Sequence, residues 1–271
     1  MDARLQKRVQ RYGWDKAAPH YERYWQDQLE PAQTALLEMA PLESGEQVLD
    51  VACGTGLVTL RAAIDVGPHG SVVGVDISED MITTASALAR ARKTDNVTFA
   101  RMDAEKLDFD SDSFDAALCA LGLMYAPDPE GAVAEMFRVT KPGGRAACAV
   151  WGERRHCGWA SIFPIADARV QSEVCPMFFR IGTGDALRVA FAEAGFSDIT
   201  MRRLQSILLY ADAREACAAS FVGGPVALAY SRFSDGVKAE AHEEYLRSIE
   251  AYRSGGGYAI PGEFVIVAGS K

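Results

Sequence analysis

A glycine-rich turn and two acidic residues form the pattern in this chain that could do chemistry. Residues 48–56 read VLDVACGTG, and Asp76 follows twenty positions after Gly56, the last glycine of this turn. Glycines in the turn let the backbone approach a ligand closely, because they carry no Cβ and accept positive φ angles. A carboxylate about twenty residues beyond such a turn accepts hydrogen bonds from ribose hydroxyls in nucleotide-binding βαβ units. The pattern therefore predicts a site for a ligand that contains a nucleoside.

Two short apolar runs must position these residues. Residues 47–51 and 71–75 are short, β-branched and bounded by glycines or charges, so we expect buried parallel strands that lead into the turn and into Asp76. Residues 57–63 then begin a helix, whose first backbone N–H groups can meet polar parts of a ligand. Further elements are expected in the same alternating order: helices over 80–93, 129–140 and 185–194, and strands over 97–100, 145–151 and 199–210.

The turn departs from the dinucleotide fingerprint in two places. Its spacing would put a third glycine at position 59, which is Thr59, and Asp50 precedes the turn where it would repel a pyrophosphate. A carboxylate there suits a ligand whose end carries an amino group. A nicotinamide-dependent oxidoreductase would share the strand, the turn and the ribose carboxylate, and it is kept as the less favoured alternative.

Residues 48–56 resemble the first motif of the class I S-adenosylmethionine-dependent methyltransferases, and the later motifs follow in the order of that family. Asp76 matches the acidic end of the second strand, and residues 101–105 (RMDAE) resemble the segment that meets the adenine. Residues 114–120 resemble the fourth strand, and residues 139–145 resemble the turn before the fifth. Within the family, the chain is most similar to the ubiquinone/menaquinone-biosynthesis-like small-molecule methyltransferases.

This resemblance covers about residues 46–151 and implies both a fold and an activity. The implied fold class is α/β, with a Rossmann-like seven-stranded methyltransferase sheet and helical cap segments. Its last strand, expected over residues 264–268, would run antiparallel to the others. The implied activity is in-line transfer of a methyl group from S-adenosylmethionine to a small aromatic or hydrophobic acceptor, with S-adenosylhomocysteine as product. A non-catalytic partner protein with the same fold is the second alternative, although the glycines and carboxylates are intact.

The resemblance also implies which residues hold the cofactor. Asp50 would meet the methionine end, Asp76 would accept from the ribose, and Asp103 would accept from the exocyclic amine of adenine. Helix caps, surface charges or a turn residue are the alternative roles of these three carboxylates. The full expected set is Asp50, Cys53, Gly54, Thr55, Gly56, Asp76, Ile77, Met81, Asp103, Ala104, Cys119, Ala120 and Leu121, with Tyr12, Trp14 and Tyr24 closing over the cofactor.

We expect a single methyltransferase domain over residues 1–271, with three segments outside the common sheet. Residues 1–40 would form an N-terminal helical lid, and residues 46–151 the cofactor-binding core. Residues 152–184 and 212–257 would be substrate-cap insertions. The lid has five aromatic residues within fourteen positions, more than one buried helix face needs, which favours an apolar cavity over ordinary packing.

Catalysis of methyl transfer needs mainly a nucleophile held in line with the methyl group, with water excluded. A general base is needed only when the nucleophile enters protonated. His156 is the candidate base, because it follows the fifth strand and can titrate near neutral pH. Asp128, Glu153 and Tyr125 are the alternatives. The sequence leaves open whether carbon, oxygen, nitrogen or sulfur is methylated.

Composition sets limits on partners and location. A net charge of −9 disfavours nucleic acid, so a small molecule is the expected substrate, and a homodimer is left open. No signal peptide is visible, and the longest uncharged apolar stretch, residues 116–127, is too short for a membrane span, so we expect a cytoplasmic protein. The six cysteines lack a CxxC pair and are expected to be buried hydrophobes without metal. A site made of His156, Cys157 and Cys175 is the weaker alternative.

Overall fold

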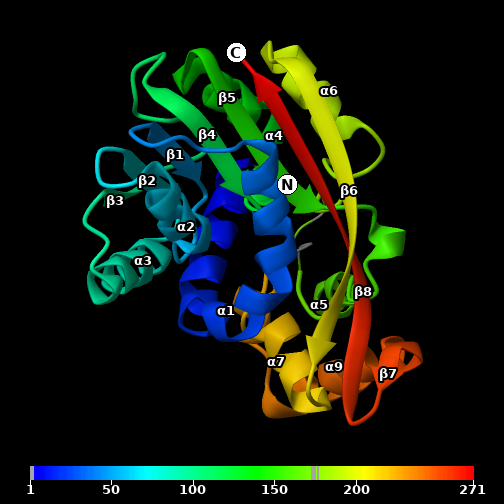
Figure 1. Ribbon diagram of the computed structural model, residues 1–271. Coiled ribbons are helices and arrows are strands. Elements are labelled where there is room, and N and C mark those ends of the chain that lie inside the picture. The colour runs from blue at the N-terminus through cyan, green and yellow to red at the C-terminus, as the bar shows by residue number, and fades with distance from the viewer. Residues whose placement is uncertain (1–2, 172–174, 176) are drawn as a thin grey trace.

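One mixed β-sheet with helices on both of its faces organises the protein (Figure 1). The computed structural model describes residues 3–171, 175 and 177–271. The sheet order is β3-β2-β1-β4-β5-β8-β6, and a short β7 pairs with β8 off this path. The strands are β1 Gln47–Val51, β2 Ser71–Asp76, β3 Val97–Arg101, β4 Phe114–Ala120, β5 Thr140–Trp151, β6 Ser197–Tyr210, β7 Arg253–Ser254 and β8 Gly257–Ser270.

The expected α/β methyltransferase sheet is confirmed, including its antiparallel strand. Strands β1 to β5 pair in parallel, and β8 lies antiparallel between β5 and β6. The helices are α1 Ala3–Met39, α2 Leu57–Val66, α3 Glu79–Arg92, α4 Pro129–Val139, α5 Ile162–Asp167, α6 Ala186–Ala194, α7 Ala213–Phe221, α8 Ala227–Tyr230 and α9 Asp235–Ser248, with 3-10 turns η1 Leu123–Tyr125, η2 Arg154–His156 and η3 Glu250–Tyr252.

The last strand is much longer than the short run expected over residues 264–268. β8 begins at Gly257 and pairs with β6 as far as Tyr210. Pro261 interrupts the β-branched pattern in the sequence, which is why that pattern ends early. In the structure Pro261 lies opposite Ile207 of β6, in the part of β8 that no longer pairs with β5. The N–H that proline lacks therefore removes no hydrogen bond between β8 and β5.

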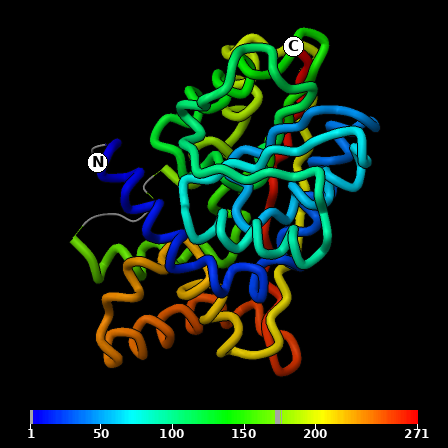
Figure 2. The backbone as a smooth tube through the Cα atoms, turned by 90° about the vertical axis from the view of Figure 1, so that its left-hand side faces the viewer, coloured from blue at the N-terminus to red at the C-terminus, as the bar shows by residue number. Residues whose placement is uncertain are grey.

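Helix α1 is one continuous element of 37 residues, with Pro19 and Pro31 inside it. Its buried side chains include Trp25, Leu29 and Leu36, which recur at helical spacing and give it one apolar face. Figure 2 shows this blue helix lying between the cyan part of the chain and the orange helices α7 to α9. It contacts α3 on one side and α7 and α8 on the other, so it spans the open end of the fold.

The core lies on both faces of the sheet, which is why its central strands read as continuous apolar runs. Val48 and Leu49 of β1 are fully buried, as are residues 146–150 of β5. Within the described residues, no helix is both long enough and apolar enough to cross a membrane.

Replacing Phe264 with alanine should lower the free energy of unfolding by about 3 to 5 kcal/mol, because the change leaves a cavity in the buried core beside β5. Phe264 of β8 is fully buried and its ring centroid lies 4.1 Å from that of Trp151 on β5. Urea unfolding with an unchanged m value would measure this loss. Ile207→Ala is the matched control, because Ile207 is 54% exposed on β6, the other neighbour of β8, and its loss should cost less than about 0.5 kcal/mol.

Candidate functional site

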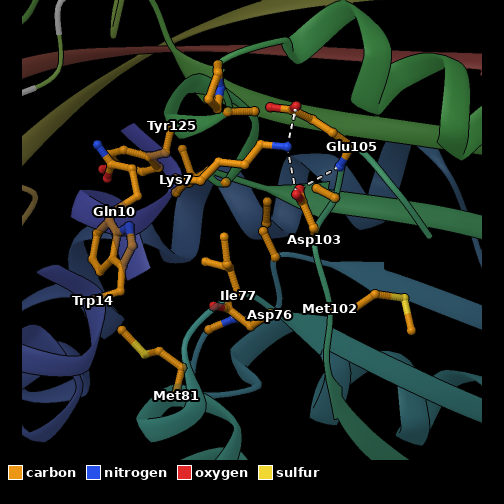
Figure 3. A pocket seen from close by; sticks show the side chains of 18 of the residues that line it. Lys7, Gln10, Trp14, Asp76, Ile77, Met81, Met102, Asp103, Glu105 and Tyr125 are labelled. Carbon is orange, nitrogen blue, oxygen red and sulfur yellow. Dashed lines mark hydrogen bonds and ion pairs between the residues drawn. The ribbon is translucent and has the colours of Figure 1, made fainter. Parts of the chain in front are cut away.

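A cavity lies at the carboxyl ends of β3, β2, β1 and β4, under the first half of α1 (Figure 3). Ligands bind at this edge of open α/β sheets, where the strand order reverses between β1 and β4. The cavity holds about 740 Å³ of empty space including its open mouth. Its lining is Lys7, Gln10, Trp14, Tyr21, Ala52, Gly54, Asp76, Ile77, Met81, Met102, Asp103, Ala104, Glu105, Ala120, Leu121, Gly122, Tyr125, Ala126 and Pro127.

Asp76 ends β2 and organises the glycine turn after β1. One carboxylate oxygen accepts the Gly54 N–H at 2.9 Å, and the other accepts the Ser78 N–H at 2.9 Å. Gly54 has a φ of 56° and Gly56 a φ of 89°, left-handed conformations that favour glycine. Burial raises the pKa of Asp76 to about 6, against the effect of its backbone hydrogen bonds.

Asp50 lies on β1, the strand next to β2, and one oxygen of its carboxylate has no hydrogen-bond partner among the described residues. Its Oδ2 accepts the Thr59 hydroxyl at 2.6 Å, whereas the buried Oδ1 has no partner among the described residues. Burial raises the pKa of Asp50 to about 7. Asp50 and Cys53 line a smaller hollow that shares Tyr21, Ala52, Gly54 and Ala120 with the main cavity. The unpaired oxygen therefore lies beside the cavity in a place that suits a cationic group.

Asp103 follows β3 and is tied to α1 through Lys7. The Lys7 ammonium lies 2.7 Å from Asp103 Oδ2 and 2.6 Å from Glu105 Oε2 (Figure 3). Although burial lowers it, these hydrogen bonds hold the pKa of Lys7 above its usual value. A second tie joins Ser78 at the start of α3 to Asp15 of α1, whose Oδ1 accepts the Ser78 hydroxyl at 2.6 Å. Both ties hold α1 over the cavity.

Comparison with known proteins places this site in a family. A methyltransferase-domain profile matches residues 42–157. The demethylmenaquinone methyltransferase of Shouchella clausii is 31% identical over 180 residues, which cover 61% of this chain and 77% of that relative. The chain belongs to the class I S-adenosylmethionine-dependent methyltransferases. It is of the ubiquinone/menaquinone-biosynthesis-like type that the sequence resembles, and S-adenosylmethionine is the cofactor of this family.

Other relatives of this chain agree. The demethylmenaquinone methyltransferase of Listeria welshimeri is 34% identical over 127 residues, which cover 47% of this chain and 54% of that relative. This chain thus spans about half the length of the first curated relatives it matches. A phosphoethanolamine N-methyltransferase 2 of Haemonchus contortus, solved with S-adenosyl-L-methionine, has a TM-score of 0.63 at 18% identity, covering 94% of this chain and 57% of that one. This likeness shows the shared fold.

The residues that the sequence predicts for the cofactor fall into three groups in the structure. Those that line the main cavity are Trp14, Gly54, Asp76, Ile77, Met81, Asp103, Ala104, Ala120 and Leu121. Asp50 and Cys53 line the adjoining hollow instead. Thr55, Gly56 and Cys119 are set back from both, and fully buried Thr55 shapes the turn from behind.

Two predicted aromatic residues lie outside the cavity. Tyr12 is 48% exposed and borders a shallow hollow on the outer side of α1. It lies about 2.5 turns from Tyr21, so the two side chains leave the helix on opposite faces. Tyr24 lies beside Arg23 in another hollow, next to Asp212 and α7. The structure therefore gives neither residue the covering role that the sequence predicts.

Several cavity residues were not anticipated from the sequence. They are Lys7, Gln10, Ala52, Met102, Glu105, Gly122, Ala126 and Pro127. Tyr21, one of the five lid aromatics expected beside an apolar cavity, lines it as well. Tyr125, named only as an alternative base, also lines the cavity. Helical spacing could have found part of this group, because Lys7, Gln10, Trp14 and Tyr21 recur at intervals of three, four and seven residues along one face.

His156 is absent from the lining of the cavity and of its two adjoining hollows. Its Nδ1 lies 3.0 Å from Oε1 of the buried Glu263, which also contacts Arg203 at 2.9 Å. The turn after β5 folds back over β8 and carries His156 with it, so the side chain is not placed to act as the predicted base. Glu153 joins the same cluster through its N–H, and Asp128 caps α4 by accepting the Gly131 N–H.

The predicted burial of the cysteines agrees with the structure, in which all six side chains are free thiols and buried. In the described part of the chain, no group of three or more His, Cys, Asp or Glu side chains could hold a metal ion.

Lys7→Met should weaken binding of S-adenosylhomocysteine about threefold to tenfold, mainly through faster dissociation, because the tie between α1 and the turn after β3 is lost. Calorimetric titration and stopped-flow dissociation would measure the two quantities. Arg8→Met, which removes the same charge from an exposed neighbour, is the matched control. An unchanged dissociation rate in Lys7→Met would show that this tie does not hold the lid.

Proposed function

We propose that this protein transfers the methyl group of S-adenosylmethionine to a small aromatic or hydrophobic acceptor. The unpaired, buried Oδ1 of Asp50 carries the proposal, because it lies beside a cavity that Asp76 and Asp103 line. A ligand with an amino group at one end, a ribose in the middle and adenine at the other would use all three carboxylates. S-adenosylmethionine has these three groups.

Each group of predicted residues would contact a different part of the cofactor. Asp50 would pair with the amino group of the methionine end, and Asp76 would accept from the ribose hydroxyls. Asp103 and Ala104 would meet the adenine, while Ala120 and Leu121 would support the amino acid moiety. When bound, the cofactor supplies a methyl group on a sulfonium, which is transferred as the C–S bond breaks and sulfur keeps the electron pair.

The acceptor would bind on the aromatic side of the cavity. Trp14, Tyr21, Leu121 and Tyr125 line both the cavity and a second hollow, which continues under α1. This wall would exclude water and hold a flat apolar molecule against the methyl group. Helix α1 would act as the lid over residues 1–40, and residues 152–184 and 212–257 would act as the substrate caps. The demethylmenaquinone methyltransferases among the relatives make quinol rings the first acceptors to test.

The test is incubation with methyl-labelled S-adenosylmethionine and either a short-chain demethylmenaquinol or a metabolite extract. We expect a labelled product together with stoichiometric S-adenosylhomocysteine, and much less product from Asp50→Asn at the same low cofactor concentration. Binding of S-adenosylhomocysteine without turnover in any extract would favour the non-catalytic alternative. Binding of a nicotinamide dinucleotide in its place would overturn the proposal. The cytoplasmic location and the homodimer stay predictions.

A further inference from the structure

A hollow walled by aromatic rings opens off the main cavity. Its enclosed volume is about 20 Å³, room for one small group such as an oxygen atom. Trp14, Tyr21 and Tyr125 line it where it meets the cavity, and Figure 3 shows Trp14 and Tyr125 on the α1 side of that cavity. Its far wall comes from three indoles, those of Trp25, Trp151 and Trp159. The hollow is therefore continuous with the proposed cofactor site but has its own walls.

Two of these indoles carry unpaired N–H groups. Trp25 is 5% exposed and Trp159 is 2% exposed, and neither ring nitrogen has a hydrogen-bond partner among the described residues. The two rings pack against each other, with centroids 6.4 Å apart and planes at 72°. Buried donors without partners are rare in folded proteins, and the two tryptophans that carry them both line this one hollow. Both have the chemistry to bind a ligand that brings an acceptor atom.

The other polar side-chain groups of the hollow are two phenolic hydroxyls, which can also donate. Of the described residues that line it, none carries a charged side chain. Burial raises the pKa of both Tyr21 and Tyr125, so their hydroxyls stay protonated and able to donate near neutral pH. The ring faces alone would also attract a cation, but the positive ends of the indole N–H groups would oppose one. An oxygen with exposed lone pairs meets no such opposition.

We propose that Trp25 and Trp159 form a subsite that binds an uncharged oxygen acceptor of the substrate, a carbonyl or hydroxyl oxygen on a ring. The inference rests on the proposed function in placing the ring of the methyl acceptor in the main cavity, with its oxygen entering this hollow. It goes further in assigning two residues outside the cofactor motifs to recognition of the acceptor. The indole N–H groups would orient the ring, and the surrounding rings would hold its apolar part.

The first test measures the affinity of the wild-type protein for two probes by calorimetric titration. Each titration is done with and without saturating S-adenosylhomocysteine. The probes are 1-indanone and indane, which share a bicyclic carbon frame and differ by one ketone oxygen. We expect 1-indanone to bind at least about tenfold more tightly, because indane leaves both donors unpaired. Phenyltrimethylammonium serves as the cationic probe. Tighter binding of phenyltrimethylammonium than of 1-indanone would overturn the proposal.

The second test uses Trp25→Phe and Trp159→Phe, which keep an aromatic ring and remove the N–H. Each should reduce the preference for 1-indanone to about threefold or less. Trp151→Phe is the matched control, because this ring packs on both others and its nitrogen is not among the buried unpaired atoms of the described chain. It should keep the preference. Near-ultraviolet circular dichroism checks folding, and 3-benzothienylalanine at positions 25 and 159 removes the N–H with almost no change of shape.

The outcomes separate this proposal from the proposed function. If S-adenosylhomocysteine binds and the wild-type protein shows no preference for the ketone, the subsite is overturned and the proposed function stands. If the ketone preference appears and S-adenosylhomocysteine does not bind, the subsite is supported and the proposed function fails. Loss of the preference in Trp151→Phe to the same extent as in the other two variants would also overturn the subsite.

Discussion

Asp50→Asn is expected to make the ligand-free protein more stable and its cofactor binding much weaker. At pH 8 the variant should melt about 4 °C higher, corresponding to about 2 kcal/mol for a domain of this size. Its affinity for S-adenosylhomocysteine should fall about 100-fold, because the amino group loses a buried anionic partner. The two effects have opposite signs because the same unpaired oxygen is costly in the empty site and useful in the occupied one.

The sign of the stability effect follows from the pKa of Asp50. Burial raises this pKa from 3.8 to about 7, so the folded protein holds the proton more tightly than the unfolded chain does. The resulting stabilisation is fully present below about pH 4 and is lost as the pH rises through about 7. Above that pH a charged carboxylate is buried without a partner for Oδ1, and an amide at this position removes that cost.

Melting temperatures from pH 4 to pH 8 would measure this effect on the ligand-free protein, and calorimetry with S-adenosylhomocysteine would measure the affinity. The wild-type protein should lose stability between pH 4 and pH 7 more steeply than Asp50→Asn. Asp65→Asn makes the same chemical change at an exposed position on α2 and should alter neither quantity. A lower melting temperature of Asp50→Asn at pH 8 would show that Asp50 has a partner in the empty site.

Asp76→Ala should reduce the affinity for S-adenosylhomocysteine by about 100-fold or more. The change removes the proposed acceptor of the ribose hydroxyls, and hydrogen bonds to a charged group contribute about 1.5 to 3 kcal/mol each. It also removes the partner of the Gly54 N–H and of the Ser78 N–H, so the glycine turn and the start of α3 lose their common anchor. Asp76→Asn should fall between the wild type and Asp76→Ala, since an amide keeps one acceptor oxygen.

Calorimetric titration of the three proteins would measure this series. Asp80→Ala is the matched control, because it removes an exposed carboxylate from the first turn of the same helix α3. Its affinity should match that of the wild type. If Asp76→Ala binds S-adenosylhomocysteine as tightly as the wild type does, the proposed placement of the cofactor is wrong.

Much of the fold could be predicted because its signals are local. The strand, turn and helix from Gln47 to Val66 are encoded by an apolar run, two glycines and a helical segment that are adjacent in the sequence. The positions of Gly54 and Asp76 beside the cavity follow from the same unit, since the carboxyl ends of neighbouring parallel strands share one edge. The length of β8 could not be read in this way, because Pro261 ends the sequence pattern while pairing with β6 continues.

The position of His156 shows the limit of reasoning from order along the chain. The residue follows β5, as a residue of the active site would, but the turn that carries it packs against Glu263 of β8. Glu263 lies more than a hundred positions later in the sequence, and nothing near His156 indicates the contact. Residue type and a neighbouring strand are therefore not enough to place a general base.

The sequence by itself determined the part of the site that would bind the cofactor. A glycine turn and a carboxylate that follow adjacent parallel strands meet wherever such strands pair. Only the tertiary structure decided which residues of α1 and of the segment after β5 complete the site. Lys7, Tyr21 and Trp25 reach the site because α1 packs across the open end of the sheet, and Trp159 joins them from beyond β5. Contacts of this kind depend on how whole elements dock, and docking is set by shape and burial over the entire core, which no local pattern of residues contains.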